Sequence, residues 1–204
     1  MKIAKALVAA VCLAVSAAAW SQAMLQEKVY NTGDALKKPM VMTPFTEFQN
    51  ARKIPALDLY TLSGEPVDLK NYRGNVVILN IWASWCAPCI REIPAITKLQ
   101  QGLKNSKIKI IGVSVDDSVT GLPRFLKRNK VSDFMTLVDP RKTVDNVIPL
   151  TVVPTNYILD GDGNMVGVLR GYLPWEDPDV LTFLKKLEAK YADPAKLEES
   201  GKQQ

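Results

Sequence analysis

The sequence contains no histidine and only three cysteines among its 204 residues. A zinc knuckle needs a second pair of cysteine or histidine ligands, which the chain does not have. We therefore expect no metal ion, and no cofactor other than a disulfide formed by the cysteines themselves.

Charge of one sign is also not concentrated anywhere in the chain. Lys and Arg number 26 against 21 Asp and Glu, and the net charge of +5 falls to +3 if Lys2 and Lys5 are removed. The positive residues are mixed with acids, whereas a nucleic-acid surface gathers them into a patch or stripe. No nucleic-acid partner is expected.

Long apolar runs are missing except at the N-terminus. Lys2 and Lys5 precede an apolar run over residues 6–20, and Ser21-Gln22-Ala23 matches a small-x-small cleavage site. The run is shorter than the about 20 residues that span a bilayer, and no later segment is apolar enough to cross one. We predict a signal peptide over residues 1–23, cleaved after Ala23, and a periplasmic product. The alternative is an uncleaved segment that anchors the protein to the membrane.

Export would leave only two cysteines in the mature protein. Cys12 departs with the signal peptide, and Val11 stands where a lipoprotein needs a small residue. Cys86 and Cys89 remain, and a disulfide between them closes a very small loop that restrains little unfolded-chain entropy. A purely structural role is therefore a poor explanation of this pair.

The position of the pair favours redox chemistry instead. An apolar run over residues 76–82 ends just before Cys86, and a helix-like pattern begins at Ala87. The positive end of a helix dipole stabilises a thiolate in the first turn, and a second cysteine one turn later can close a ring disulfide. This arrangement is sufficient for reversible thiol–disulfide exchange.

Strand and helix patterns alternate along the rest of the chain. Alternating residues 56–60 and 66–69 around Ser63-Gly64-Glu65 predict a hairpin, and Asp160-Gly161-Asp162-Gly163 predicts a second hairpin turn. The latter resembles a calcium loop only at its start, because Met165 and Gly171 occupy positions that need Gly and Glu. Strands are expected over residues 76–82, 107–115, 134–138, 155–159 and 165–169, and helices over 87–103 (kinked at Pro94), 119–130, 141–147 and 175–192.

These elements form a specific combination. Val77-Ile78-Leu79-Asn80-Ile81-Trp82-Ala83-Ser84-Trp85-Cys86-Ala87-Pro88-Cys89 precedes a helix, and Val153-Pro154-Thr155 precedes a strand. In this order they resemble the thioredoxin superfamily, and more closely its exported TlpA/ResA-like branch. The resemblance covers residues 55–190, between an N-terminal extension (24–54) and a flexible C-terminal tail (191–204).

The resemblance implies an α/β, thioredoxin-like fold. It has a central mixed sheet flanked by helices, an N-terminal β-hairpin and a helix–strand insertion between residues 115 and 154. It also implies a cis peptide at Val153–Pro154 beside the disulfide, where a substrate peptide pairs its backbone; such a bond is energetically accessible. The alternative is that Pro154 only starts a strand. Trp85 and Pro88 complete the expected substrate-binding residues, although Trp85 could be a plain core or surface aromatic.

Cys86 is predicted to be the nucleophile, at the helix start, and Cys89 to be the buried thiol that resolves the mixed disulfide. Plain thioredoxins carry an acid six residues before the first cysteine, where this chain has Asn80. Glu92, one turn after Cys89, is the candidate that replaces it in proton transfer. The alternative is that Glu92 only suits the helix dipole.

The leading hypothesis is an exported monomeric thiol–disulfide oxidoreductase. The family and the Ala87-Pro88 dipeptide between the cysteines favour a reductant of protein disulfides in cytochrome c or copper-site maturation, re-reduced by a membrane electron donor. The alternatives are a peroxiredoxin-like peroxidase, which Ser84 and Trp85 before Cys86 do not favour, and a non-enzymatic Cu(I) carrier or adaptor.

Overall fold

Strand β5 (Val76–Trp82) lies at the centre of the molecule, and all seven of its side chains are buried. Alternate residues contact two separate cores, with Ile78 and Trp82 on one face of the sheet and Leu79 and Ile81 on the other. A strand that is apolar on both faces must be covered on both sides. The sequence prediction of a central buried strand is therefore confirmed.

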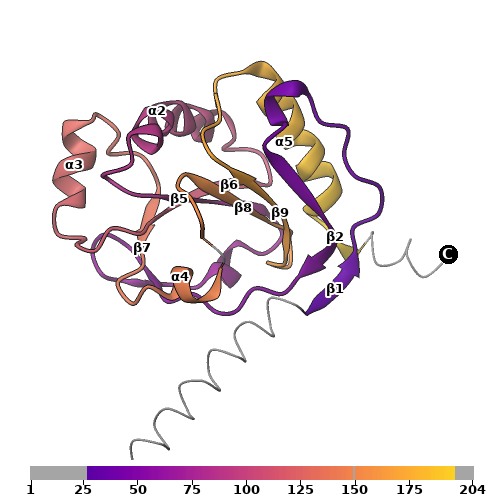
Figure 1. Cartoon of the computed structure of the whole chain (residues 1–204), viewed down its shortest axis with the longest axis horizontal. Helices are drawn as coiled ribbons and strands as arrows, with labels where there is room; N and C mark the ends of the chain where they lie inside the picture. Colours follow the sequence, from indigo (N-terminus) through magenta and orange to yellow (C-terminus); the bar gives the residue numbers. More distant parts are fainter. Residues whose placement is uncertain (1–26, 149, 196–204) are drawn as a thin grey trace, which may run out of the picture.

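The computed structural model describes residues 27–148 and 150–195. The predicted signal peptide, and the part of the predicted tail from residue 196 onward, lie outside the described residues. The described chain forms one mixed nine-stranded sheet in the order β1-β2-β9-β8-β5-β6-β7-β3-β4 (Figure 1). Its other strands are β1 (Lys28–Asn31), β2 (Phe45–Arg52), β3 (Leu59–Tyr60), β4 (Pro66–Val67), β6 (Ile108–Ser114), β7 (Thr136–Val138), β8 (Thr155–Leu159) and β9 (Met165–Arg170).

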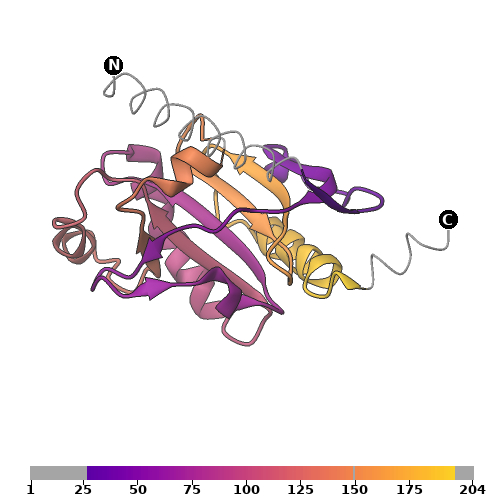
Figure 2. The ribbon, with the colours of Figure 1, turned by 90° about the horizontal axis from the view of Figure 1, so that it is seen from below.

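Helices cover both faces of this sheet, as the resemblance implied (Figure 2). Buried residues of α2 (Ala87–Gly102), α3 (Leu122–Arg128) and α5 (Pro178–Tyr191) pack into the core that contains Ile78 and Trp82. The short α4 (Thr143–Val147) packs into the core on the opposite face. Two 3-10 turns, η1 (Met40–Met42) and η2 (Leu69–Tyr72), complete the described elements.

The predicted insertion and hairpins are present. Between β6 and β8 the chain adds α3, β7 and α4, and β7 lengthens the sheet beside β6. β3 and β4 pair antiparallel, as do β8 and β9 around the 160–164 turn. The Asp160 carboxylate accepts hydrogen bonds from the backbone N–H groups of Asp162 and Asn164. The Asp160 carboxylate therefore stabilises the hairpin turn.

The N-terminal extension is the main difference from the prediction. β1 and β2 continue the same sheet beyond β9, and Met42 and Phe45 enter its core. Gly167 of β9 permits this packing, because a Cβ there would lie 2.6 Å from the Phe45 ring. The boundary at residue 55 therefore does not separate an appendage from the folded domain. The sequence showed no strand here because an irregularity in β2 breaks its alternation.

The start of the last helix also differs. The predicted helix began at Trp175, whereas α5 begins at Pro178 after Asp177, whose side chain accepts from the N–H of Asp179. Leu173 and Trp175 are buried in the segment before it. That segment places both residues against α2, at the site described next.

Candidate active site

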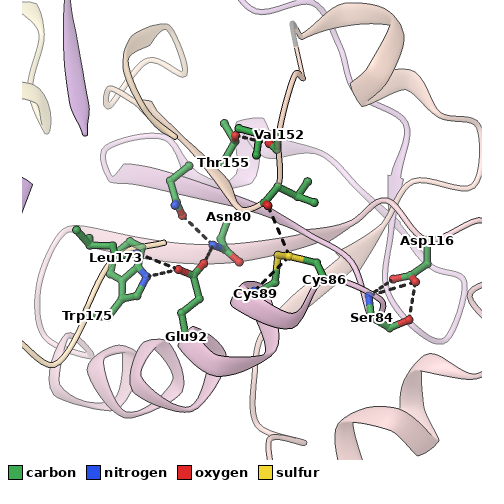
Figure 3. Close-up of a disulfide and its surroundings, with 12 residues drawn as sticks. Asn80, Ser84, Cys86, Cys89, Glu92, Asp116, Val152, Thr155, Leu173 and Trp175 are labelled. Carbon is green, nitrogen blue, oxygen red and sulfur yellow. Dashed lines mark hydrogen bonds between the residues drawn. A yellow bond between two sulfur atoms is a disulfide. The ribbon is translucent and has the colours of Figure 1, made fainter. Parts of the chain in front are cut away.

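Cys86 and Cys89 form a disulfide at the junction of β5 and α2, with their Cα atoms 5.3 Å apart (Figure 3). Cys86 is the N-cap residue of α2, and the backbone N–H of Cys89 donates a hydrogen bond to Cys86 Sγ at 3.2 Å. A donor aimed at this sulfur from the helix N-terminus would stabilise a Cys86 thiolate after reduction. The chain therefore places Cys86 where a nucleophilic thiol is favoured.

The two cysteine residues differ in their access to solvent. Cys86 is 5% exposed and Cys89 is fully buried, so the predicted order holds, although Cys86 is less open than expected. Beside them Trp85 is 69% exposed, which excludes a core role for this ring. Pro88 occupies the first turn of α2, where its missing N–H has no helical partner to lose. Pro94 lies within α2, and the helix continues through it.

The Val153–Pro154 peptide bond is cis, as the resemblance implied. The carbonyl oxygen of Val153 lies 3.6 Å from Cys86 Sγ. The hydroxyl of Thr155 donates to the carbonyl of Val152 at 2.6 Å and closes this turn. The bend thus presents backbone polar groups next to the reactive sulfur.

Sequence reasoning missed four further residues near this turn, namely Arg91, Val152, Gly171 and Tyr172. The N–H of Gly171 donates to the carbonyl of Pro154 at 2.8 Å, so the segment after β9 lies against the cis turn. Tyr172 and Val152 are exposed large apolar residues, and the Arg91 guanidinium lies 5.5 Å from the centre of the Tyr172 ring. The sequence signal for this turn was the glycine after Arg170. Gly171 has a φ of 86°, which glycine adopts readily, so the chain can turn here after β9.

Glu92 lies in the core and not on the helix surface. Its side chain is 1% exposed, and its carboxylate accepts hydrogen bonds from Asn80 Nδ2 (2.9 Å), the N–H of Leu173 (3.3 Å) and Trp175 Nε1 (3.2 Å). Burial raises its pKa to about 7, against the lowering effect of these three donors. The interpretation that Glu92 only suits the helix dipole does not explain a buried carboxylate.

Asn80 joins Glu92 to a second buried amide. Asn80 Nδ2 also donates to the Oδ1 atom of Asn156 at 2.9 Å, from β5 to the neighbouring β8. Asn80 Oδ1 and Asn156 Nδ2 are buried and have no hydrogen-bond partner. The structure thus brings Asn80 and Glu92 together, and adds Asn156; sequence reasoning found neither contact.

Asp116 holds the turn that precedes the disulfide. Its carboxylate accepts hydrogen bonds from the backbone N–H and the hydroxyl of Ser84 (Figure 3), and also from the hydroxyl of Ser114 at 2.7 Å. These contacts connect the end of β6 to the residue before Trp85. Sequence reasoning missed Asp116, because its partner Ser84 lies 32 residues away.

The remaining chemistry of the described residues is limited. Within residues 27–148 and 150–195, no group of three or more cysteine, aspartate, glutamate or histidine residues is arranged to hold a metal ion. Over the same range, no helix combines the length and apolar character needed to cross a membrane.

Known sequences and structures resemble this chain over the same region. The profile of the AhpC/TSA family matches residues 51–168. The thiol-disulfide oxidoreductase ResA of Geobacillus kaustophilus is 30% identical over 123 residues, which are 60% of this chain and 70% of that protein. ResA of Bacillus thuringiensis subsp. konkukian is 26% identical over 136 residues, 67% of this chain and 77% of that protein.

Solved structures show the same fold. A protein assigned as the thiol:disulfide interchange protein DsbE of Chlorobium tepidum superposes with a TM-score of 0.59 and 25% identity, over 69% of this chain and 96% of that one. A secreted thiol-disulfide isomerase of Corynebacterium glutamicum gives a TM-score of 0.61 at 21% identity, over 82% of this chain and 99% of that one.

Proposed function

This chain belongs to the AhpC/TSA family of the thioredoxin superfamily and is a thiol–disulfide oxidoreductase of the ResA/DsbE type. We propose that it reduces disulfides of partner proteins outside the cytoplasm. The observation that carries the proposal is the Cys86–Cys89 disulfide at the start of α2, with the Cys89 N–H bonded to Cys86 Sγ. That bond favours the thiolate that begins thiol–disulfide exchange.

The reaction proceeds in two exchange steps from the reduced protein. The Cys86 thiolate attacks one sulfur of the partner disulfide, the partner S–S bond breaks, and the leaving sulfur takes up a proton. Cys89 then loses its proton and attacks Cys86 Sγ. The mixed disulfide breaks, the second partner sulfur leaves and is protonated, and the Cys86–Cys89 disulfide forms. Two electrons pass to the partner.

Glu92 supplies the proton acceptor for the second step. Cys89 is fully buried, so its proton cannot pass directly to solvent. Glu92 is one turn further along α2, and its pKa of about 7 suits a group that exchanges protons near neutral pH. Asn80 lies between Glu92 and the disulfide (Figure 3), which supports a route through its side chain.

The partner docks on an exposed apolar rim around the disulfide. Trp85, Val152 and Tyr172 provide this rim, from the segment before α2, the cis turn and the segment after β9. Large exposed apolar side chains grouped at one place favour a protein contact. The carbonyl oxygen of Val153 beside Cys86 Sγ offers a backbone acceptor to an extended partner segment.

Features of the sequence support the proposed direction of electron flow and the proposed location. The cysteines enclose Ala87-Pro88 and no histidine that would stabilise a thiolate as in a strong oxidant. The N-terminal pattern of residues 1–23 favours export to the periplasm. A reductant in the periplasm needs a membrane electron donor to keep it reduced. The proposed process is cytochrome c or copper-site maturation. The protein is proposed to act as a monomer.

Trapping of the partner with Cys89→Ser tests this function. The variant retains the nucleophile but cannot resolve the mixed disulfide, so we expect a covalent complex that dithiothreitol releases. Cys86→Ser is the matched control and should trap nothing. A reduction potential near the about −120 mV of strong periplasmic oxidants would contradict the reductant role. Rapid peroxide consumption by the wild type would support the peroxidase alternative instead.

A further inference from the structure

Asn80 and Asn156 form a buried amide pair whose outer atoms have no partner. Asn80 Nδ2 lies 2.9 Å from both Glu92 Oε1 and Asn156 Oδ1, while Asn80 Oδ1 and Asn156 Nδ2 are left unpaired. We propose that the two amides reverse together when Glu92 takes up a proton, so that Asn80 and Asn156 act as positioning residues for proton transfer at the disulfide. The proposal deepens the function above and rests on it for its role in the reaction.

The arrangement in the structure fits an ionised Glu92. A carboxylate can only accept hydrogen bonds, so it selects the orientation of Asn80 that points Nδ2 toward it. Asn156 must then present Oδ1, because the nearest atom of Asn80 is a donor. One ionised group therefore sets both amide orientations, since the two ends of an amide are distinguished by their hydrogen-bond partners.

Protonation of Glu92 reverses this selection. Glu92 Oε2 receives hydrogen bonds from the N–H of Leu173 and from Trp175 Nε1. Neither of these N–H groups can accept a hydrogen bond from a proton on Oε2. The added proton must therefore reside on Oε1, where Asn80 Nδ2 opposes it as another donor. If Asn80 reverses, Oδ1 accepts from the Glu92 hydroxyl. Asn156 then has to reverse as well, so that its Nδ2 donates to the same oxygen.

The reversal is balanced within the pair. Each arrangement contains one amide–amide hydrogen bond, one bond to Glu92 and two buried amide atoms without partners. The pair itself therefore favours neither state, although each unpaired atom has the free-energy cost of a buried polar group. The groups that contact the carboxylate from β5 and from the segment before α5 are all neutral, and no described ion pair involves Glu92. The proton on Glu92 decides the orientation.

The reversal also changes which amide atom Asn80 presents on its side toward the disulfide. Asn80 lies between Glu92 and the disulfide (Figure 3), so reversal exchanges an acceptor for a donor on its side away from Glu92. The acceptor suits a neutral Cys89 thiol, and the donor suits a Cys89 thiolate. When Cys89 gives up its proton and Glu92 gains one, the net charge of the buried site is unchanged. The amide pair thus links the two events.

Nuclear magnetic resonance on the oxidised full chain tests the reversal, because neither cysteine titrates there. The side-chain carboxyl ¹³C signal of Glu92 and the side-chain ¹⁵NH₂ signals of Asn80 and Asn156 are followed between about pH 4.5 and 9, a window around the pKa of Glu92 near 7. We expect all three to shift with one midpoint. Nuclear Overhauser contacts of the Asn80 amide protons should pass from Glu92 at high pH to the disulfide side at low pH.

Glu92→Gln is the matched variant. Its Nε2 can only donate toward Asn80, so it should hold the reversed orientation, with Asn80 and Asn156 signals that do not change with pH. Asn80 amide contacts that stay on Glu92 throughout the wild-type titration would overturn the proposal, as would Asn156 signals that ignore the Glu92 midpoint. No substrate turns over in this titration, so a failed reversal leaves the trapping result intact, and failed trapping leaves the titration intact.

Discussion

The backbone N–H and the hydroxyl of Ser84 both donate hydrogen bonds to the carboxylate of Asp116, at 2.9 and 2.6 Å. Ser84 lies two residues before Cys86, and Asp116 follows the end of β6. The shape of the loop that carries the nucleophile is therefore held by a contact outside that loop.

Asp116→Ala should slow thiol–disulfide exchange without preventing folding. The substitution removes the acceptor of the two Ser84 hydrogen bonds that hold the turn before Trp85. Misplacement of a reacting group by about 1 Å can reduce a rate by up to about 100-fold. We expect a decrease of about 10- to 100-fold in the rate of reduction of a disulfide-containing model protein such as insulin. Asp116→Asn, which retains one acceptor oxygen, should fall between.

Asp117→Ala is the control for this change, because its exposed carboxylate pairs with Lys142 on the surface and not with Ser84. Its exchange rate should equal that of the wild type. An equal loss in both variants would show that general loop charge, and not the Ser84 contact, is responsible.

Trp85→Ala should weaken partner docking. The ring is 69% exposed beside the disulfide, and large aromatic side chains contribute most of the binding energy at many interfaces. We expect KM for the partner trapped with Cys89→Ser to rise about 10-fold with kcat little changed, as for lost uniform binding. Val29→Ala, an exposed position on the outermost strand β1, should leave both constants unchanged. A fall in kcat alone would contradict a docking role.

Glu92 should make the oxidised protein less stable as pH rises. Its pKa is about 7 in the fold and near 4.5 when unfolded, so the folded state binds the proton more tightly between these values. Stability is therefore greatest below about pH 4.5 and declines up to about pH 7, by about 3 kcal/mol in total. Urea denaturation at a series of pH values measures this decline.

Glu92→Gln should abolish most of that decline, because its amide does not titrate. The exposed Glu65→Gln should retain it. A wild-type curve that runs parallel to that of Glu92→Gln between pH 5 and 7 would contradict a raised pKa of the buried carboxylate.

Glu47→Ala should destabilise the protein strongly. Glu47 lies on β2 and pairs with Lys190 of α5 at 2.6 Å, and their side chains are only 6% and 12% exposed. Removal of one partner of a buried pair leaves a charge uncompensated, which costs about 3–5 kcal/mol. Chemical denaturation checks this value. The control is Glu27→Ala in the half-exposed pair with Lys53, where less than about 1 kcal/mol is expected.

The sequence predicted the parts of the fold and site that depend on neighbouring residues. β5 is apolar at six of its seven positions, Cys86 and Cys89 are one helical turn apart, and Val153-Pro154-Thr155 is a local motif. Each of these patterns is set by a few adjacent residues, so it could be recognised without knowledge of the rest of the chain.

The parts that could not be predicted depend on contacts between distant residues. Glu92 receives hydrogen bonds from residues 81 and 83 positions later, and Asn80 meets Asn156 across 76 positions. Hydrophobic periodicity does not predict such contacts between distant residues. The burial of Glu92 in particular follows from Leu173 and Trp175, which lie in the segment before α5, although Trp175 was expected to begin that helix.

The two ends of the described chain lie at the end of the sheet opposite to the disulfide. Gly161, in the turn between β8 and β9, donates its N–H to the carbonyl of Tyr191, and Lys28 pairs with Arg52 beside the start of β9. The disulfide follows the other end of β5. A tether attached at either end, whether a resin, a fusion partner or a lipid surface, would therefore leave the reactive face turned toward solution.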